Sequence, residues 1–146
     1  MNLLHAHLIV NHIPVLGIPF ASLALGYALI MGKEEIRKGL LWLFVLLSIG
    51  AIAVYYTGDE GKESKRNWSR IEESRIETHE DAATFALGGT LLLGVIAAGC
   101  LALSAFPGSG KLQRRVVWIL LFCGLFVSTI LARTAFTGGA IRHGEE

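Results

Sequence analysis

The chain has 146 residues, of which 13 are Lys or Arg and 12 are Asp or Glu, and charged residues make up 17% of the sequence. These charges are clustered, because residues 1–32, 39–58, 82–110 and 116–132 contain none of them. A water-soluble domain spreads charge over its whole surface, at about a quarter of its residues. The composition therefore excludes a soluble domain.

Each charge-free window is long enough to cross a bilayer as a helix. A helix rises about 1.5 Å per residue and a bilayer core is about 30 Å thick, so about 20 residues suffice. Transmembrane strands would be about 10 residues long with alternating polarity, and these windows are longer and uniformly apolar. We therefore predict a single all-α transmembrane domain over residues 1–146, with a hydrophilic loop at 59–81 and four spans at about 5–31, 38–56, 82–106 and 116–136.

The connections predict the arrangement of these spans. Residues 32–38 and 107–115 are short connectors, which favour an up-down-up-down antiparallel bundle with both termini on one face. The densest clusters of Lys and Arg lie in these two connectors, so we expect them to face the cytoplasm and the termini to face away from it. The expected partner is the lipid bilayer. A net charge of +1 without a basic stripe argues against a nucleic-acid partner.

In this topology all five histidines lie on the face that carries the termini. His5, His7 and His12 begin the first span. His79 precedes the third span and His143 follows the fourth. Imidazole is a common ligand for transition metals and haem iron, and polar residues inside a membrane are functional candidates by default. The alternative interpretation is a set of ordinary polar side chains at the membrane interface.

His12 is the most informative of the five, because it lies well inside an uncharged window, between Asn11 and Pro14. On an ideal helix His12 shares a face with His5, whereas His7 is rotated from it by about 140°. Pro14 and Pro19 also predict a kink or a broken first turn near residues 11–16. The histidines of the first span are therefore expected to contact different partners.

The residue pattern leaves two kinds of ligand open. A di-iron bundle would need Glu-x-x-His on two helices, and the sequence has no such motif. A zinc or copper site built from His5, His7 and a loop carboxylate fits the ligand types but has no diagnostic spacing. Bis-histidine haem b needs one imidazole from each of two facing helices and an apolar slot between them.

Three short patches resemble a family of small bacterial four-helix membrane proteins of unknown function. Residues 7–14 match its H-x-x-x-x-H-x-P motif, His79 matches a histidine near the start of its third span, and residues 138–144 are similar to its GG-x-x-x-RHG tail. The chain departs from the family pattern in Ala6, Asn11 and the additional His5.

The resemblance implies a site and a setting. Family members occur joined to Rieske-type or cytochrome c modules, which implies electron transfer at a bacterial inner membrane. It implies one or two b-type haems, with four histidines as axial candidates and His5 as a spare or alternative ligand. Those four are His7, His12, His79 and His143. Arg133 and Arg142 are then placed to meet haem propionates, because guanidinium pairs with carboxylates bidentately.

The predicted function is a small membrane b-type cytochrome. It would pass electrons between membrane quinol, or a partner subunit, and a Rieske or cytochrome c type partner on the non-cytoplasmic side. No base or nucleophile motif points to catalysis in its own right, and quinol oxidation stays open. The alternatives are a haem-free structural or assembly subunit of a larger respiratory complex, which would make the chain part of an oligomer, and a His-rich protein that binds a divalent metal.

Overall fold

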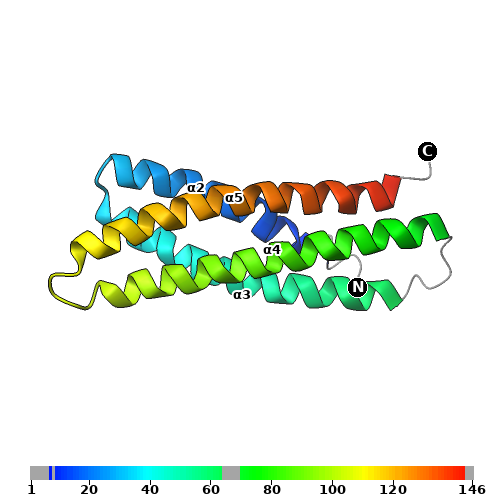
Figure 1. The fold of residues 1–146 in the computed structure, drawn as a ribbon, viewed down its shortest axis with the longest axis horizontal. Coiled ribbons are helices and arrows are strands. Elements are labelled where there is room, and N and C mark those ends of the chain that lie inside the picture. The colour runs from blue at the N-terminus through cyan, green and yellow to red at the C-terminus, as the bar shows by residue number, and fades with distance from the viewer. Residues whose placement is uncertain (1–6, 8, 64–69, 144–146) are drawn as a thin grey trace.

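A computed structural model describes residue 7, residues 9–63 and residues 70–143 of the chain. Those residues contain no strand. They form four helices, α2 (His12–Ile30), α3 (Glu34–Glu63), α4 (Arg70–Leu103) and α5 (Gly110–His143). Successive helices run in opposite directions along one bundle (Figure 1). The predicted all-α, up-down-up-down bundle is confirmed, and all four helices are long and apolar enough to cross a membrane.

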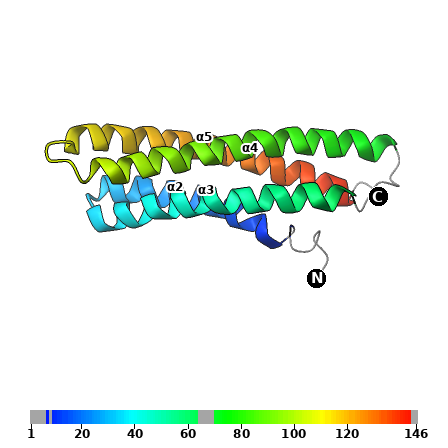
Figure 2. The ribbon, with the colours of Figure 1, turned by 90° about the horizontal axis from the view of Figure 1, so that it is seen from below.

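The two ends of the bundle differ in what they carry. We call the end with residue 7, the last turns of α3 and α5 and the first turns of α4 the histidine end. The opposite end, with residues 31–33 and 104–109, is the connector end (Figure 2). At the histidine end α3 continues to Glu63 and α4 begins at Arg70. The described parts of segment 59–81, expected as a loop, are therefore helical extensions of the spans.

Proline shapes the start of the first span. Residues 7, 9 and 10 are helical, Asn11 forms a turn, and α2 begins at His12. Pro14 has no N–H to donate to the Val10 carbonyl, which is the physical reason for an interruption at this point. The Asn11 N–H still bonds to the His7 carbonyl at 3.0 Å, so residue 7 stays attached to the helix.

The connector end is closed by two tight turns that need glycine. Gly32 has φ +64° and follows α2, and the Lys33 N–H returns to the Ala28 carbonyl at 2.9 Å, which is the long bond of a Schellman motif. Gly108 has φ +83° in the connection between α4 and α5, where the Ser109 hydroxyl donates to the Phe106 carbonyl at 2.8 Å. These turns hold consecutive helices antiparallel.

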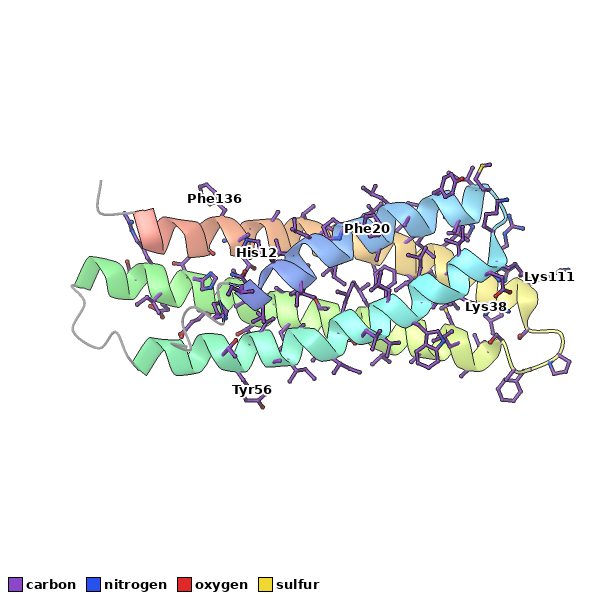
Figure 3. The ribbon with its side chains drawn as sticks, turned by 180° about the vertical axis from the view of Figure 1, so that it is seen from behind. His12, Phe20, Lys38, Tyr56, Lys111 and Phe136 are labelled. Carbon is purple, nitrogen blue, oxygen red and sulfur yellow. The ribbon has the colours of Figure 1, made fainter. Side chains whose placement is uncertain are left out.

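Large apolar side chains lie on the outside of the bundle. Phe20, Tyr56 and Phe136 point away from the helices (Figure 3), with exposures of 67%, 65% and 78%. Lipid tails are as apolar as these side chains, so this outer surface suits a bilayer. The interior combines large apolar residues, such as Phe44 and Leu93, with small ones, such as Ala21 and Ala97.

Close contact between the helices depends on glycine facing serine. A Cβ added at Gly94 of α4 would overlap the Ser48 side chain of α3. A Cβ added at Gly124 of α5 would overlap the Ser22 hydroxyl of α2 in the same way. Both serines are buried, and their hydroxyls bond within their own helices, Ser22 to the Ile18 carbonyl at 2.8 Å. Small residues thus let the backbones approach, as in many membrane bundles.

The α2–α3 and α4–α5 hairpins are two copies of one arrangement. Positions correspond at a spacing of 72 residues in the first helix of each hairpin and of 80 residues in the second. A Cβ added at Gly17 would lie 2.6 Å from Leu47, and one added at the corresponding Gly89 would lie 2.9 Å from the corresponding Val127. Burial follows the same spacing, as four pairs of buried residues show: Ile18 and Thr90, Ala21 and Leu93, Leu25 and Ala97, Ala28 and Cys100.

We predict that Gly94→Leu destabilises the bundle by about 1–3 kcal/mol, the usual cost of overpacking. The added side chain would push α4 away from Ser48, so thermal unfolding followed by circular dichroism in detergent should begin at a lower temperature. Gly99→Leu on the same helix is the control, because nothing lies within 4 Å of its added Cβ. Equal loss of stability in both variants would contradict the packing described here.

Candidate functional site

His7 is held by the second helix of its own hairpin. Its Nδ1 lies 3.1 Å from the Val54 carbonyl oxygen and 3.3 Å from Thr57 Oγ1. The Thr57 hydroxyl itself donates to the Val54 carbonyl at 2.9 Å, which fixes its oxygen beside the ring. The side chain of His7 is half-buried.

His79 repeats this arrangement in the second hairpin. Its Nδ1 lies 3.1 Å from the Thr134 carbonyl oxygen and 3.1 Å from Thr137 Oγ1. The Thr137 hydroxyl donates to the Thr134 carbonyl at 3.0 Å, as Thr57 does to Val54. His7 and His79 correspond at the spacing of 72 residues, and their threonine partners at 80, so the two sites are equivalent positions of the repeat.

A glycine after each threonine makes room for the imidazole. A Cβ added at Gly58 would lie 2.9 Å from His7 Cε1, and one added at Gly138 would lie 3.0 Å from His79 Cε1. Any larger residue would crowd the ring. We call each imidazole with its carbonyl, threonine and glycine a histidine clamp, the His7 clamp and the His79 clamp.

The clamps determine which nitrogen of each ring carries the proton. A carbonyl oxygen can only accept a hydrogen bond, so the Nδ1 that faces it must donate. In the neutral imidazole the other nitrogen, Nε2, then carries a lone pair and no proton. This tautomer is the one that binds a metal through Nε2, with the Nδ1–H···O=C bond setting the orientation of the ring.

The two clamps occupy equivalent positions in the two hairpins. Both lie at the histidine end, where the apolar windows of α3 and α5 finish at Gly58 and Gly139. The bundle therefore places two half-buried imidazoles of defined tautomer at the same margin of its apolar zone.

The structure places the other predicted site residues differently. His12 is exposed and lies towards the histidine end (Figure 3), whereas His7 is half-buried. The two side chains therefore lie in different surroundings. Arg133 is also exposed, although the adjacent Thr134 belongs to the His79 clamp. His5 and the side chains of Arg142 and His143 lie outside the described part of the chain, so their predicted roles stay predictions.

The sequence did not predict the hydrogen-bond partners of His7 and His79. Two carbonyl oxygens cannot be recognised from residue identity, because every residue has one. The repeated Thr-Gly dipeptide at 57–58 and 137–138, each following an aromatic residue, was a visible signal. Its meaning depends on the spacing between hairpins, which becomes apparent only when the helices are superposed.

Comparison of the chain with models of protein families, with curated proteins and with solved structures finds no match in any of the three. The resemblance to the bacterial four-helix family therefore rests on residues 7–14, His79 and residues 138–144. The geometry of the clamps stands independently of that resemblance.

We predict that His7 and His79 both hold the proton on Nδ1 when neutral. Long-range ¹H–¹⁵N spectra of histidine-labelled protein, free of haem and metal, should show a protonated Nδ1 and a bare Nε2 for both residues. Gly138→Leu should abolish this pattern for His79 alone, because the new side chain displaces the ring. Gly139→Leu is the control, since nothing lies within 4 Å of its added Cβ. A protonated Nε2 in the unaltered protein would contradict the clamp geometry.

Proposed function

We propose that the chain is a small membrane b-type cytochrome in which His7 and His79 are the two axial ligands of one haem. The observation that carries the proposal is the matched pair of clamps, each with its Nδ1 held by a carbonyl and a threonine at 3.1–3.3 Å. Bound haem b would supply one-electron transfer, while the chain supplies the ligands and their surroundings.

The donor set of the clamps fits haem iron. Bis-histidine haem requires two neutral imidazoles from different parts of the fold, and the clamps supply one from each hairpin. Within the described residues no group of three His, Cys, Asp or Glu is arranged to hold a metal ion. Zinc sites typically use three or four protein ligands, whereas two imidazoles complete the axial set of a bis-histidine haem.

The clamps also supply what a ligand needs from its neighbours. The carbonyls of Val54 and Thr134 make each ring a stronger donor, because a hydrogen bond from Nδ1 raises the basicity of Nε2. The threonine hydroxyls hold the rings against rotation. The clamps lie at the margin of the apolar zone, and the polarity around a bound haem together with its ligands would tune its potential.

The position of the clamps supports the proposed path of electrons. They lie at the margin of the apolar zone, within reach of a quinol in the bilayer or of a partner subunit on one side and a redox protein outside the membrane on the other. Under the expected orientation, that outside is the non-cytoplasmic face. A second haem, held through His12 and His143, and the contact of Arg133 and Arg142 with propionates remain proposals of the same kind.

An optical spectrum of the purified protein tests the central proposal. Reduction should produce split α and β bands, and acidic acetone should extract one haem per chain held by the two clamps. His7→Ala and His79→Ala should each abolish this haem, while His12→Ala should leave it in place. A protein that carries no haem even when supplied with it during expression would overturn the proposal.

Metal analysis of the same preparation distinguishes the haem protein from the two alternatives, a divalent-metal protein and a structural subunit. Stoichiometric zinc or copper, lost in both His7→Ala and His79→Ala without any haem spectrum, would favour the divalent-metal protein. A stable, monodisperse protein with neither haem nor metal would favour the structural subunit.

We further predict that Thr137→Val weakens haem binding about 10–100-fold, the usual effect of removing a group that orients a metal ligand. Valine has the shape of threonine but cannot accept a hydrogen bond from His79 Nδ1. Thr129→Val on the same helix is the matched control, because Thr129 is exposed and its hydroxyl donates to the Phe126 carbonyl of its own helix. The measurement is haem titration of the apoprotein, followed by the reduction potential. Equal affinities in the two variants would refute a role for the clamp threonine.

A further inference from the structure

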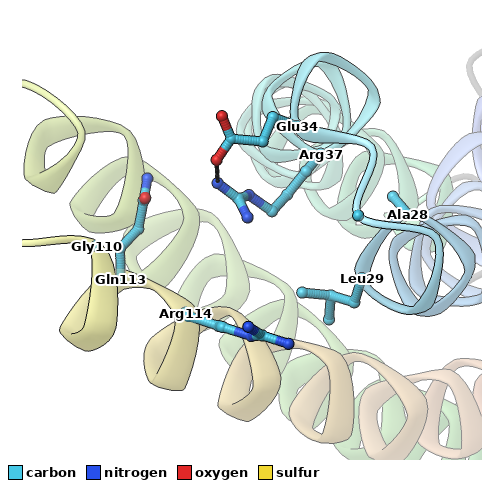
Figure 4. Close-up of a pocket in the computed structure, with 8 residues that line it drawn as sticks. Ala28, Leu29, Glu34, Arg37, Gly110, Gln113 and Arg114 are labelled. Atoms are coloured by element: carbon cyan, nitrogen blue, oxygen red, sulfur yellow. Dashed lines mark hydrogen bonds and ion pairs between the residues drawn. The ribbon is translucent and has the colours of Figure 1, made fainter.

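A second polar site lies at the connector end, opposite the histidine clamps. A cavity of about 270 Å³ opens there between the end of α2 and the starts of α3 and α5. Arg37 of α3 and Arg114 of α5 flank this space from two different helices (Figure 4). Its lining residues are Ala28, Leu29, Gly32, Glu34, Arg37, Gly110, Gln113 and Arg114.

Arg37 has donors to spare at this cavity. One terminal nitrogen bonds to Glu34 at 2.9 Å, but the buried Nε has no hydrogen-bond partner among the described residues. The side chain is only 15% exposed. A buried donor of a charged group without a partner is costly, and rotation of the Arg37 side chain toward an acceptor in the cavity would relieve that cost.

Helix packing does not require an arginine at this position. The corresponding residue of the second hairpin, 80 residues later, is Val117, which is fully buried. Likewise Glu34 corresponds to Arg114. The repeat is thus broken at the cavity, and the break places positive side chains around it.

The connector end carries an excess of positive charge. Its two connectors contain six basic residues and only two acidic ones, Glu34 and Glu35. Both acids are already paired, with Arg37 at 2.9 Å and Lys38 at 3.3 Å. No acid remains in either connector to neutralise Arg114. The starts of α3 and α5 add the positive ends of two helix dipoles at the same place.

Positive charge around the cavity favours an anionic ligand, and the size and position of the cavity indicate which kind of anion would fit. Pockets that enclose a drug-sized ligand measure about 300–1,000 Å³, so this cavity suits a head group rather than a whole lipid. Exposed apolar residues adjoin its lining residues along the chain, with Ile30 at 77%, Met31 at 53% and Leu112 at 53% exposure. These side chains would lie against acyl chains while the arginines hold a phosphate, for which guanidinium has a matching geometry.

We propose that the cavity between Arg37 and Arg114 binds the phosphate group of an anionic phospholipid. The site is separate from the histidine clamps and holds whether or not the chain binds haem. Because the two N-terminal helix ends and both arginines converge on it, the lipid would tie α3 and α5 together at the connector end.

Native mass spectrometry of the full chain in detergent tests this site, with phosphatidylglycerol and phosphatidylcholine as probes. The unaltered protein should retain one phosphatidylglycerol in preference to phosphatidylcholine. Arg114→Gln should lower that affinity at least about tenfold, the effect of losing hydrogen bonds to a charged group. Arg115→Gln removes the same charge from the adjacent residue, which does not line the cavity, and should retain the lipid.

A second variant guards against a general loss of folding. Arg37→Val places at this position the residue that its counterpart in the second hairpin already carries, so it should fold and lose the lipid preference. Equal losses in Arg114→Gln and Arg115→Gln, or no preference for phosphatidylglycerol in the unaltered protein, would overturn the proposal.

Inorganic phosphate distinguishes the source of the anion. If phosphate alone raised the unfolding temperature as much as phosphatidylglycerol, and Arg114→Gln removed the effect, the ligand would be a soluble phosphate and not a lipid.

Discussion

Helices inside a bilayer satisfy their own backbone hydrogen bonds, but the hydrophobic effect does not drive them together, since lipid is as apolar as leucine. Their association then depends on how closely the backbones can approach. In this chain Gly94 meets Ser48 and Gly124 meets Ser22, at contacts that leave no room for a Cβ. These contacts join α4 to α3 and α5 to α2, so they lock the two hairpins together. Together with the buried apolar core, they set how the two hairpins lie relative to each other.

The duplication of the hairpin explains why two equivalent imidazoles occur together. Each hairpin places a histidine from the histidine end of its first span against a Thr-Gly pair near the end of its second helix. Since both hairpins point the same way along the bundle, a feature at one end of the first copy reappears at the same end of the second. A symmetric pair of imidazoles follows directly from this repeat.

The two ends of the molecule have different chemistry. The histidine end carries two imidazoles held through their Nδ1 atoms, and the connector end carries cationic side chains around a cavity. The repeat holds at the histidine end and is broken at the connector end, where the position that corresponds to Arg37 is occupied by Val117. The proposed haem site and the proposed lipid site would therefore lie at opposite ends of the bundle.

The sequence by itself determined the number of spans, their order and the end of the bundle at which His7, His12 and His79 lie, because lack of charge over about 20 residues and short connectors leave few other folds in a bilayer. It did not reveal that α3 and α4 extend past their apolar windows, since helix continues through charged residues once its spans are formed. Nor did it single out His7 and His79 from His12. That choice belongs to the tertiary structure, because the partners are the carbonyls of Val54 and Thr134, which have no side-chain signature and come into place only when the hairpins close.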